Sequence, residues 1–237
     1  MFIPGENLLS HYHQLDGTIE FYGRINSLLK NTDNVLDLGA GRGSWYLTDK
    51  CSYRKELRNI KDKVKYLVGA DIDEAVLKNS TTHENIIIKL EKIPLDDNSM
   101  NLIIADWVLE HVQDPIKFYS EVNRVLMPGG VFCARTPHKY KYISLLTSLF
   151  KNKYHSKVLK LIQPERAELD IFPTAFKLNT QRIIKKTFYN YENFSYLYTS
   201  HPSYFANNKL LFNLLSCFHK LLPAFMVSEI FVFLKKK

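Results

Sequence analysis

The feature that most constrains the fold is a short, largely apolar run, residues 35–38, followed at once by three glycines in alternate positions. The run has the length and β-branched character of a buried parallel strand. Glycine accepts positive φ and has no Cβ, so the backbone can turn sharply and approach a ligand closely. Residues 44–47 can open a helix. A strand, a tight glycine turn and a helix N-terminus together predict a nucleotide-type pocket at the carboxyl end of a parallel sheet.

The spacing of an acid and the glycines narrows the kind of ligand. A dinucleotide fingerprint reads G-x-G-x-x-G, whereas the order here is Asp37-x-Gly39-x-Gly41-x-Gly43. An acid before the first glycine suits a cationic or polar amino-acid group better than a pyrophosphate, and the glycine spacing argues against a dehydrogenase. This order resembles motif I of the class I S-adenosylmethionine (SAM)-dependent methyltransferases. A glycine turn in another kind of α/β protein is the alternative.

Three later stretches follow in the order that this family shows. Residues 95–103 resemble its loop into the fourth strand, and residues 109–115 and 121–130 resemble the segments that come after that strand. The similarity covers about residues 35–137. Lys89 departs from the pattern, because the family often has an acid there that contacts the adenine amine. The affinity for the cofactor is the property that this change affects.

The alternation of apolar runs and helical stretches predicts a mainly parallel α/β sheet with right-handed crossovers. The resemblance implies a Rossmann-like class I methyltransferase fold, with a seven-stranded sheet whose last strand is antiparallel and helices on both faces. Residues 1–34 are expected to form a helical cover and residues 35–237 the methyltransferase domain, with a substrate-lid insertion at about residues 138–178. The later strands are expected at residues 66–71, 84–89, 100–106, 131–136, 194–199 and 227–234, and helices at residues 16–30, 44–58, 180–187 and 207–222 and from residue 115.

The strand ends and the resemblance together suggest the cofactor site. Asp71 falls at the carboxyl end of the second strand, where an acid can accept both ribose hydroxyl protons; a plain strand-end turn is the alternative. Asp73 has the position of a helix N-cap. Adenine is expected near Leu90 and apolar side chains such as Ile72, and Trp107 is expected on adenine, on the substrate or in the core. The expected cofactor-binding residues are Asp37, Gly39, Ala40, Gly41, Gly43, Asp71, Ile72, Leu90, Asp106 and Trp107.

Methyl transfer from SAM needs alignment of the acceptor and, for an oxygen or carbon acceptor, often a base. His138 and His111 are the candidate bases because they follow the fifth and fourth strands and because histidine titrates in the useful range. His138 has the better position to face a substrate. A structural histidine is the alternative for both, and His111 could brace its loop. Arg135, Arg166 and Lys177 are candidates to bind a phosphate or a sugar acid.

The cysteines give no sign of a metal or a disulfide. Cys51, Cys133 and Cys217 lie far apart and form no C-x-x-C pair, so neither a zinc site nor a disulfide framework is expected. The chain has no run of about 18 apolar residues, and its first residues lack the charged start and apolar core of a signal peptide. A cytoplasmic location is expected, with contact at the inner face of the membrane as an addition.

The net charge of +8 favours acidic partners such as phosphorylated ligands, nucleic acid or an anionic membrane surface; a lysine-rich surface without such a role is an equal alternative. Nucleic acid is set aside, because residues 106–109 lack the (Asn/Asp)-Pro-Pro-aromatic motif of enzymes that methylate amino groups of DNA. The helix at residues 207–222 and the Lys235–Lys237 tail could contact anionic lipid. A buried crossover helix with a solvated tail is the favoured interpretation.

These observations predict a SAM-dependent methyltransferase that acts on a small molecule or a glycan. Residues 170–180 loosely resemble a stretch found in methyltransferases of bacterial polysaccharide and glycan clusters. O-methylation of a sugar in surface polysaccharide biosynthesis is therefore the favoured acceptor chemistry. Two alternatives stay open: a lipid-linked or quinone acceptor at the membrane surface, and a non-catalytic SAM-binding partner subunit, which Lys89 alone supports.

Overall fold

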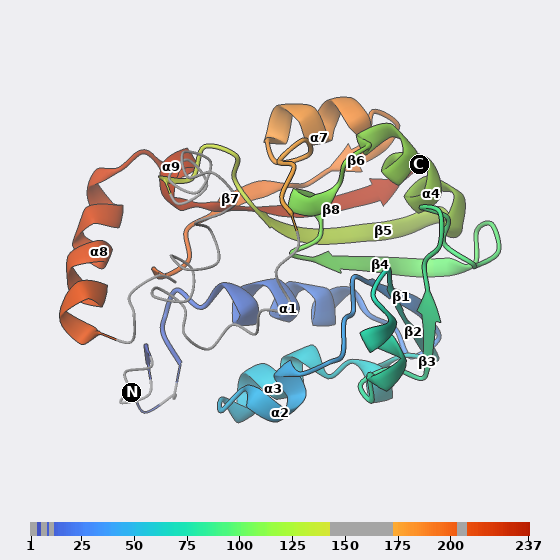
Figure 1. Cartoon of the computed structure of the whole chain (residues 1–237), viewed down its shortest axis with the longest axis horizontal. Helices are drawn as coiled ribbons and strands as arrows, with labels where there is room; N and C mark the ends of the chain where they lie inside the picture. The colour runs from blue at the N-terminus through green and yellow to red at the C-terminus, as the bar shows by residue number, and fades with distance from the viewer. Residues whose placement is uncertain (1–3, 6–8, 10–11, 143–172, 203–207) are drawn as a thin grey trace.

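An eight-stranded sheet organises the computed structural model, which describes residues 4–5, 9, 12–142, 173–202 and 208–237. Neighbouring strands follow the order β3-β2-β1-β4-β5-β8-β6, and β7 also pairs with β8. Helices lie on both faces of the sheet (Figure 1). The expected Rossmann-like α/β architecture is confirmed.

The elements of the described residues have the following bounds. The strands are β1 (Asn34–Leu38), β2 (Tyr66–Asp71), β3 (Glu84–Ile87), β4 (Met100–Asp106), β5 (Leu126–Pro137), β6 (Tyr191–Asn193), β7 (Tyr196–Tyr198) and β8 (Glu229–Lys236). The helices are α1 (Gly17–Leu28), α2 (Trp45–Thr48), α3 (Ser52–Arg58), α4 (Pro115–Val125), α7 (Gln181–Thr187), α8 (Lys209–Leu221) and α9 (Ala224–Val227). Short 3-10 turns are η1 (Lys61–Lys63), η2 (Glu74–Lys78) and η3 (Leu109–His111).

Strands β1 to β5 are parallel to their neighbours among these five strands, whereas β8 lies antiparallel to β5, β6 and β7. The pairs Asn193–Leu234 and Tyr196–Phe231 belong to one continuous register on β8. Strands β6 and β7 are therefore two pieces of a single strand, interrupted at residues 194–195. The sheet has eight named strands, but β6 and β7 count as one interrupted strand. The predicted seven-stranded sheet with an antiparallel last strand is therefore present.

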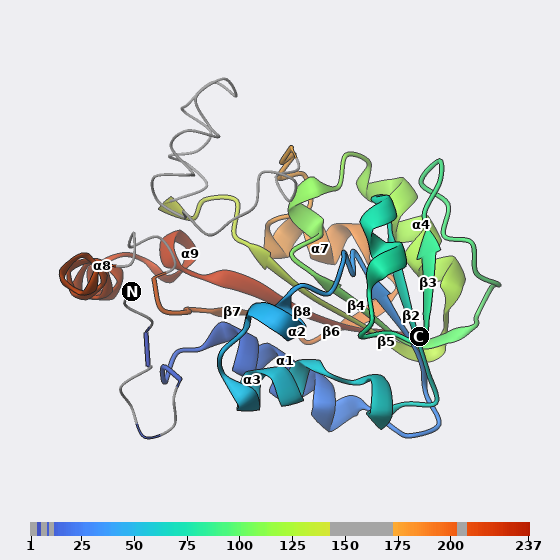
Figure 2. The ribbon, with the colours of Figure 1, turned by 60° about the horizontal axis from the view of Figure 1, so that its bottom comes forward.

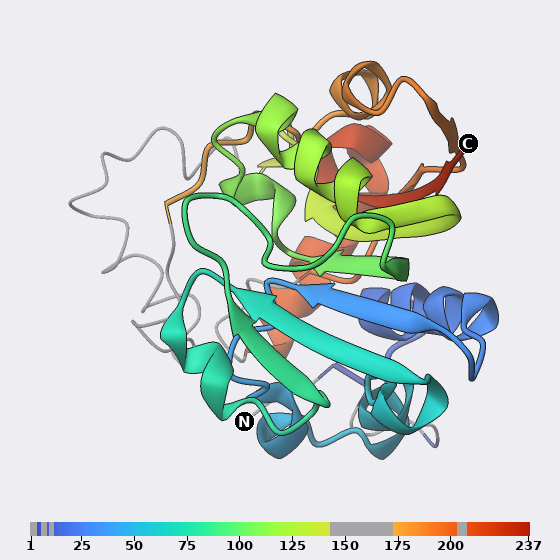
Figure 3. The ribbon, with the colours of Figure 1, turned by 90° about the vertical axis from the view of Figure 1, so that its right-hand side faces the viewer.

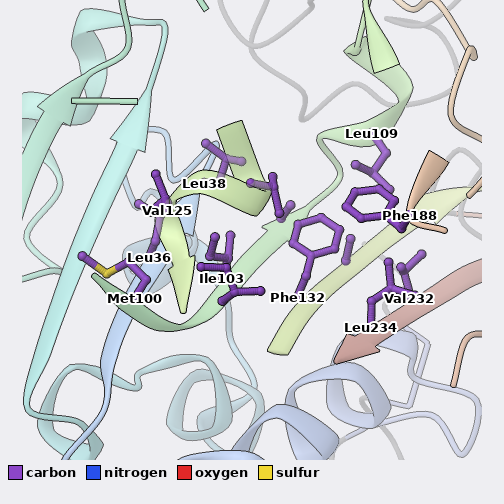
Figure 4. Packing of buried hydrophobic residues seen from close by; sticks show 14 of the residues in the cluster. Leu36, Leu38, Met100, Ile103, Leu109, Val125, Phe132, Phe188, Val232 and Leu234 are labelled. Carbon is purple, nitrogen blue, oxygen red and sulfur yellow. The ribbon is translucent and has the colours of Figure 1, made fainter. Parts of the chain in front are cut away.

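Alternate residues of the central strands pack on opposite faces of the sheet, as the two-residue repeat of a strand requires. One hydrophobic cluster contains Ile103 and Phe132 together with residues of α4 and α7, and Figure 4 shows part of it. The other cluster contains their neighbours Leu102 and Cys133 together with residues of α1 and α3. The result is a three-layer arrangement, with the sheet between the two sets of helices (Figure 3).

The helix predicted at residues 44–58 is wrong in one respect, because it is broken into α2 and α3. Between them, the Asp49 carboxylate accepts a hydrogen bond from Cys51 N at 2.9 Å and forms an ion pair with Arg54. Such a local bond from a side chain to the backbone competes with helical hydrogen bonding. Arg54 also pairs with Asp16, which ties α3 to the start of α1.

The helix expected at residues 16–30 is α1. The Asp16 carboxylate caps its start by accepting hydrogen bonds from Thr18 N at 3.0 Å and Ile19 N at 3.1 Å. Phe21 and Tyr22 of this helix are buried against the sheet. The role of residues 1–34 as a cover for a cofactor stays a prediction.

The lysines at residues 235–237 and helix α8 do not form one surface patch. Helix α8 and the C-terminus lie at opposite ends of the sheet (Figure 1). Lys236 Nζ donates to Asn123 O and Leu126 O, both at 2.6 Å, and so satisfies carbonyls at the end of α4. Lys236 is therefore bonded within the protein, and the membrane contact expected of the last helix and the lysine tail stays a prediction. No helix in the described ranges is both long and apolar enough to cross a bilayer.

Candidate functional site

The glycine turn after β1 has the positive φ values that its sequence predicts. Gly39, Gly41 and Gly43 have φ of +77°, +51° and +68°. A Cβ on Gly39 would collide with the Val108 side chain, and a Cβ on Gly43 would collide with the Asn79 side chain. A Cβ on Gly41 would meet nothing within 4 Å. Gly39 and Gly43 are thus required for packing, whereas Gly41 faces open space.

Asn79 fastens the outer side of this turn. Its Nδ2 donates to Ala40 O at 3.2 Å and to Gly41 O at 3.1 Å. Its Oδ1 accepts from Thr81 N at 2.9 Å and from Thr81 Oγ1 at 2.7 Å, and the residue is buried. Sequence reasoning missed Asn79. The polar run of residues 79–82, directly before a strand, is the signal that could have found it.

Asp71 joins the end of β2 to the glycine turn. Its Oδ2 accepts from Gly41 N at 2.9 Å, and its Oδ1 accepts from Asp73 N at 3.0 Å. Each carboxylate oxygen has a second lone-pair site, so Asp71 can still accept hydrogen bonds from hydroxyl groups. Asp73 accepts from Ala75 N at 2.8 Å and caps η2, which confirms its predicted structural role. The ribose contact of Asp71 stays a prediction.

A pocket lies beside this turn, toward the carboxyl ends of β1 and β4. It brings together five of the predicted cofactor residues, Asp37, Gly39, Ala40, Asp106 and Trp107. The rest of the lining is Tyr22, Trp45, Arg58, Ile60, Leu67, Thr81 and Ile104. The wall therefore carries two acids and an arginine among aromatic and aliphatic groups.

Asp106 is held by two neighbours in the pocket wall. Arg135 donates from Nε to Asp106 Oδ1 and from Nη2 to Asp106 Oδ2, both at 2.8 Å. Its Nη1 donates to Thr18 Oγ1 at 3.0 Å, and the residue is 4% exposed. Tyr22 Oη donates to Asp106 Oδ2 at 3.3 Å. Arg135 therefore neutralises and positions Asp106. Because its guanidinium is buried and paired, it is not free for a substrate in this arrangement, and the contact with a phosphate or sugar acid expected of it stays a prediction.

Asp37 and Arg58 bring opposite charges to the same pocket. Burial raises the pKa of Asp37 to about 7, and the Asp106 charge adds to the rise while the Arg58 charge opposes it. The Arg58 guanidinium lies 4.5 Å from the centre of the Trp45 ring. Its Nε is buried and has no hydrogen-bond partner among the described residues. A buried donor without a partner is costly, so Arg58 is a candidate to bind an anionic group of a ligand, and sequence reasoning missed it.

Trp107 follows β4 in a left-handed conformation, with φ of +60°. Its N donates to Arg135 O at 2.9 Å, and the Arg135 guanidinium lies 5.0 Å from its ring. Such strain at a non-glycine residue persists where the surroundings enforce it. Leu90 also has positive φ, and both Leu90 and Ile72 are exposed and do not line this pocket. The expected adenine contacts of Leu90 and Ile72 stay predictions.

The two candidate bases are not among the residues that line the pocket. His138 is buried, its Nδ1 accepts from Tyr140 N at 3.2 Å, and burial lowers its pKa. His111 Nδ1 donates to Pro173 O at 3.0 Å, which agrees with the bracing alternative. A base role for Nδ1 of His138 requires its bond with Tyr140 to open. Both catalytic assignments stay predictions.

The other candidate substrate residues are not brought to the pocket. Lys177 Nζ donates to Gln113 O at 2.9 Å and so braces a loop. Arg166 and most of the expected lid at residues 138–178 lie outside the described residues. The substrate contacts expected of Lys177 and Arg166 stay predictions.

A buried polar cluster, which sequence reasoning also missed, joins the end of β5 to the loops around it. Thr136 Oγ1 donates to Glu110 Oε2 at 2.9 Å, and Asn179 Nδ2 donates to Thr136 Oγ1 at 2.6 Å. Glu110 O accepts from Ala175 N at 2.7 Å. These bonds fix the segments that carry both candidate histidines.

Comparisons with known proteins agree with this geometry. Residues 36–134 match the family model described as a methyltransferase domain. A probable S-adenosylmethionine-dependent methyltransferase of Mycolicibacterium smegmatis is 33% identical over 147 residues, which cover 59% of this chain and 51% of that protein. A demethylmenaquinone methyltransferase of Chlamydia trachomatis is 27% identical over 158 residues, which cover 62% of this chain and 67% of that protein. The chain spans about half the length of the first of these relatives.

Solved structures show the same fold. A SAM-dependent methyltransferase from Methanosarcina mazei superposes with a TM-score of 0.55 at 18% identity, over 90% of this chain and 96% of that chain. The sheet order and the glycine turn after β1 are seen in the structure of this chain and do not depend on its similarity to other proteins. The match of residues 36–134 to a methyltransferase domain, the methyltransferase relatives and the shared fold support a class I SAM-dependent methyltransferase, and S-adenosyl-L-methionine is the cofactor that this class implies.

Proposed function

We propose that this chain is an enzyme that transfers a methyl group from S-adenosyl-L-methionine to a small-molecule or glycan acceptor. The observation that carries the proposal is the pocket in which the glycine turn, Asp37 and Asp106 meet, with Arg135 bonded to Asp106 behind its wall. The match of residues 36–134 to a methyltransferase domain supports the same reaction class.

Residues of the pocket, and Gly41 and Asp71 at the glycine turn beside it, fit the two ends of this cofactor. Gly41 leaves open space where another residue would place a Cβ, and Asp71 presents a carboxylate fixed by two backbone amides. We assign the ribose hydroxyls to Asp71. The methionine end carries an ammonium and a carboxylate. Asp37 suits the ammonium, and Arg58, with its unpartnered buried Nε, suits the carboxylate.

The chain contributes alignment to the reaction. When bound, the cofactor supplies the reactivity, because its sulfonium activates the methyl carbon toward attack. The contacts of Asp106 with Tyr22 and Arg135 hold the pocket wall in one geometry. A wall that is already ordered reduces the entropy cost of bringing an acceptor into line with the methyl group.

We propose a sugar hydroxyl as the acceptor. The resemblance of residues 170–180 to methyltransferases of glycan clusters supports this assignment. The lowered pKa of His138 also supports it, because a neutral ring can accept the hydroxyl proton once its bond with Tyr140 opens. A quinone or another lipid-borne acceptor is the second candidate, and the similarity to a demethylmenaquinone methyltransferase favours it.

Calorimetry tests the cofactor assignment, with NAD as the unrelated ligand. Wild-type protein should bind SAM, and Asp71→Asn should weaken that binding by about tenfold, the value of one charge-assisted hydrogen bond. Asp73→Asn is the matched control, because asparagine also caps η2 and the affinity should not change. Absence of SAM binding by the folded wild-type protein would overturn the proposed function.

Transfer of label from methyl-labelled SAM tests the acceptor, with nucleotide sugars, lipid-linked sugars and a quinone offered in parallel. His138→Gln should lower kcat with a sugar by about a hundredfold or more, as expected for loss of a base, and should leave the affinity for SAM unchanged. Labelling of the quinone and of no sugar would refute the sugar assignment and keep the reaction class.

A further inference from the structure

Helix α8 carries an apolar stripe that the described structure leaves exposed. The stripe consists of Leu210, Leu211, Leu214, Phe218 and Leu221, which recur at helical spacing and share one face of the helix. Leu214 is 60% exposed and Leu221 is 82% exposed. A buried crossover helix would cover such side chains, so the favoured interpretation of this helix from sequence is wrong.

The opposite face of α8 is anchored to the rest of the protein. Phe212 and His219 are its buried residues. The Phe212 ring meets the His13 ring edge-on, with centroids 5.7 Å apart, and His219 Nε2 forms a hydrogen bond with Tyr142 Oη at 3.1 Å. Because these contacts fix the rotation of the helix, the stripe faces away from the protein.

Helix α8 stands at the same end of the sheet as the pocket. In Figure 1 the arrowhead of β4 points to the side on which α8 lies, and Figure 2 shows α8 on that side in a second view. The pocket includes Asp106 and Trp107, at the carboxyl end of β4. A surface that covers the stripe would therefore lie toward the pocket end of the sheet.

The positive charge around α8 favours an anionic partner for the stripe. Lys209 and Lys220 are exposed on this helix, and the sequence between Glu192 and Glu229 contains no acidic residue. Leucine and phenylalanine on one face, with lysines beside them, are typical of a helix that lies in a membrane interface. A second copy of this chain would instead bring lysines close to lysines in a protein whose net charge is already +8.

We propose that the α8 stripe binds an anionic lipid surface and holds the pocket end of the protein against it, so that the methyl acceptor is lipid-borne. The apolar side chains enter the boundary between headgroups and acyl chains, while Lys209 and Lys220 contact the anionic headgroups. This inference rests on the proposed methyltransferase function and narrows its acceptor class. A lipid-linked sugar and a quinone belong to that class, whereas a free nucleotide sugar does not.

Co-sedimentation with vesicles tests the surface. Wild-type protein should bind vesicles of phosphatidylglycerol and phosphatidylcholine at least about tenfold more tightly than vesicles of phosphatidylcholine alone, since each lysine near an anionic surface contributes roughly fivefold. Leu214→Gln/Leu221→Gln should lose at least about tenfold of the binding to anionic vesicles, because it removes two apolar side chains from the interface. Ile116→Gln is the matched control, because Ile116 is an exposed aliphatic residue of α4, and it should bind as wild type does.

Two further measurements separate the outcomes. Calorimetry with SAM should give the wild-type affinity for every variant, which shows that the fold and the cofactor site are intact. Wild-type protein that does not sediment with anionic vesicles would overturn the proposal, and unchanged SAM binding would leave the methyltransferase function standing. Equal sedimentation of wild type and the stripe variant would also overturn it. Light scattering covers one more outcome. If the wild-type protein is a dimer, Leu214→Gln/Leu221→Gln is a monomer and neither binds lipid, the stripe would be assigned to a second copy of the chain instead.

Discussion

Asp37 should make SAM binding depend on pH between about pH 5.5 and pH 7. Burial raises the pKa of this carboxyl to about 7, whereas an ordinary aspartate is ionised throughout that interval. A cationic ligand group favours the ionised carboxylate, so the apparent affinity follows the ionised fraction. With a pKa of about 7, that fraction rises from about 0.03 at pH 5.5 to about 0.5 at pH 7, and the affinity should rise about sixteenfold.

Calorimetry at constant ionic strength measures this change, and Asp37→Asn is the control. Asparagine keeps the shape of the side chain but has no proton to lose, so its affinity should vary by less than about twofold over the same interval. The α-amino group of the ligand titrates near pH 8 or slightly below, and it does so with both proteins. The ratio of the two affinities therefore isolates the contribution of Asp37. Parallel pH profiles for wild type and Asp37→Asn would refute the reasoning.

The same pKa also affects the ligand-free protein. Because the pKa of Asp37 is higher in the folded state than in the unfolded state, the folded state holds this proton more tightly. The contribution of Asp37 to stability is therefore present in acid and is lost as the pH rises from about 4 to about 7. Asp37→Asn should raise the Tm of the ligand-free protein more at about pH 8 than at about pH 5. A Tm difference that does not change with pH would contradict the raised pKa.

Three further substitutions test the pocket and the glycine turn beside it. Arg58→Met should lower the affinity for SAM by about tenfold to a hundredfold, the value of a hydrogen bond to a charged group, and should leave the affinity for decarboxylated SAM unchanged; an equal loss for both ligands would remove Arg58 from the carboxylate site. Gly39→Ala should destabilise the fold by about 2–4 kcal/mol, because its Cβ meets Val108 in a left-handed turn. Gly41→Ala should cost about 1–2 kcal/mol and mainly weaken SAM binding; thermal unfolding and calorimetry separate the two effects, and equal destabilisation would show that Gly41 is packed.

Features that depend on neighbouring residues could be predicted from the sequence. Positive φ at Gly39 and Gly41 follows from glycine itself, in a turn that must be tight. Asp73 caps η2 because its side chain reaches an amide two residues later. Strand β4 occupies the predicted residues 100–106, because an apolar run of this length fits the buried centre of a parallel sheet. These local rules placed the glycine turn and the strands that surround the pocket.

Features that depend on residues far apart could not be predicted in this way. Asn79 reaches Gly41 across 38 positions, and nothing in its own neighbours reveals that contact. Helix α8 has the composition of a buried helix, but the positions of His13 and Tyr142 decide which of its faces is covered. Composition gives the apolar residues of a helix, whereas the packing of distant segments decides which of them meet solvent.

Strand register explains why the second acid of the pocket, Asp106, already has a cation bonded to it while Asp37 has none. Strands β4 and β5 are parallel neighbours in which Asp106 and Arg135 are register partners. The two residues are 29 positions apart in the sequence, so an arginine at a strand end resembles a substrate ligand until the register is known. The register places a cation on Asp106 inside the protein. Asp37, on β1, has no such cation bonded to it among the described residues, so a cationic ligand can add to the partial stabilisation that the Arg58 charge gives its carboxylate.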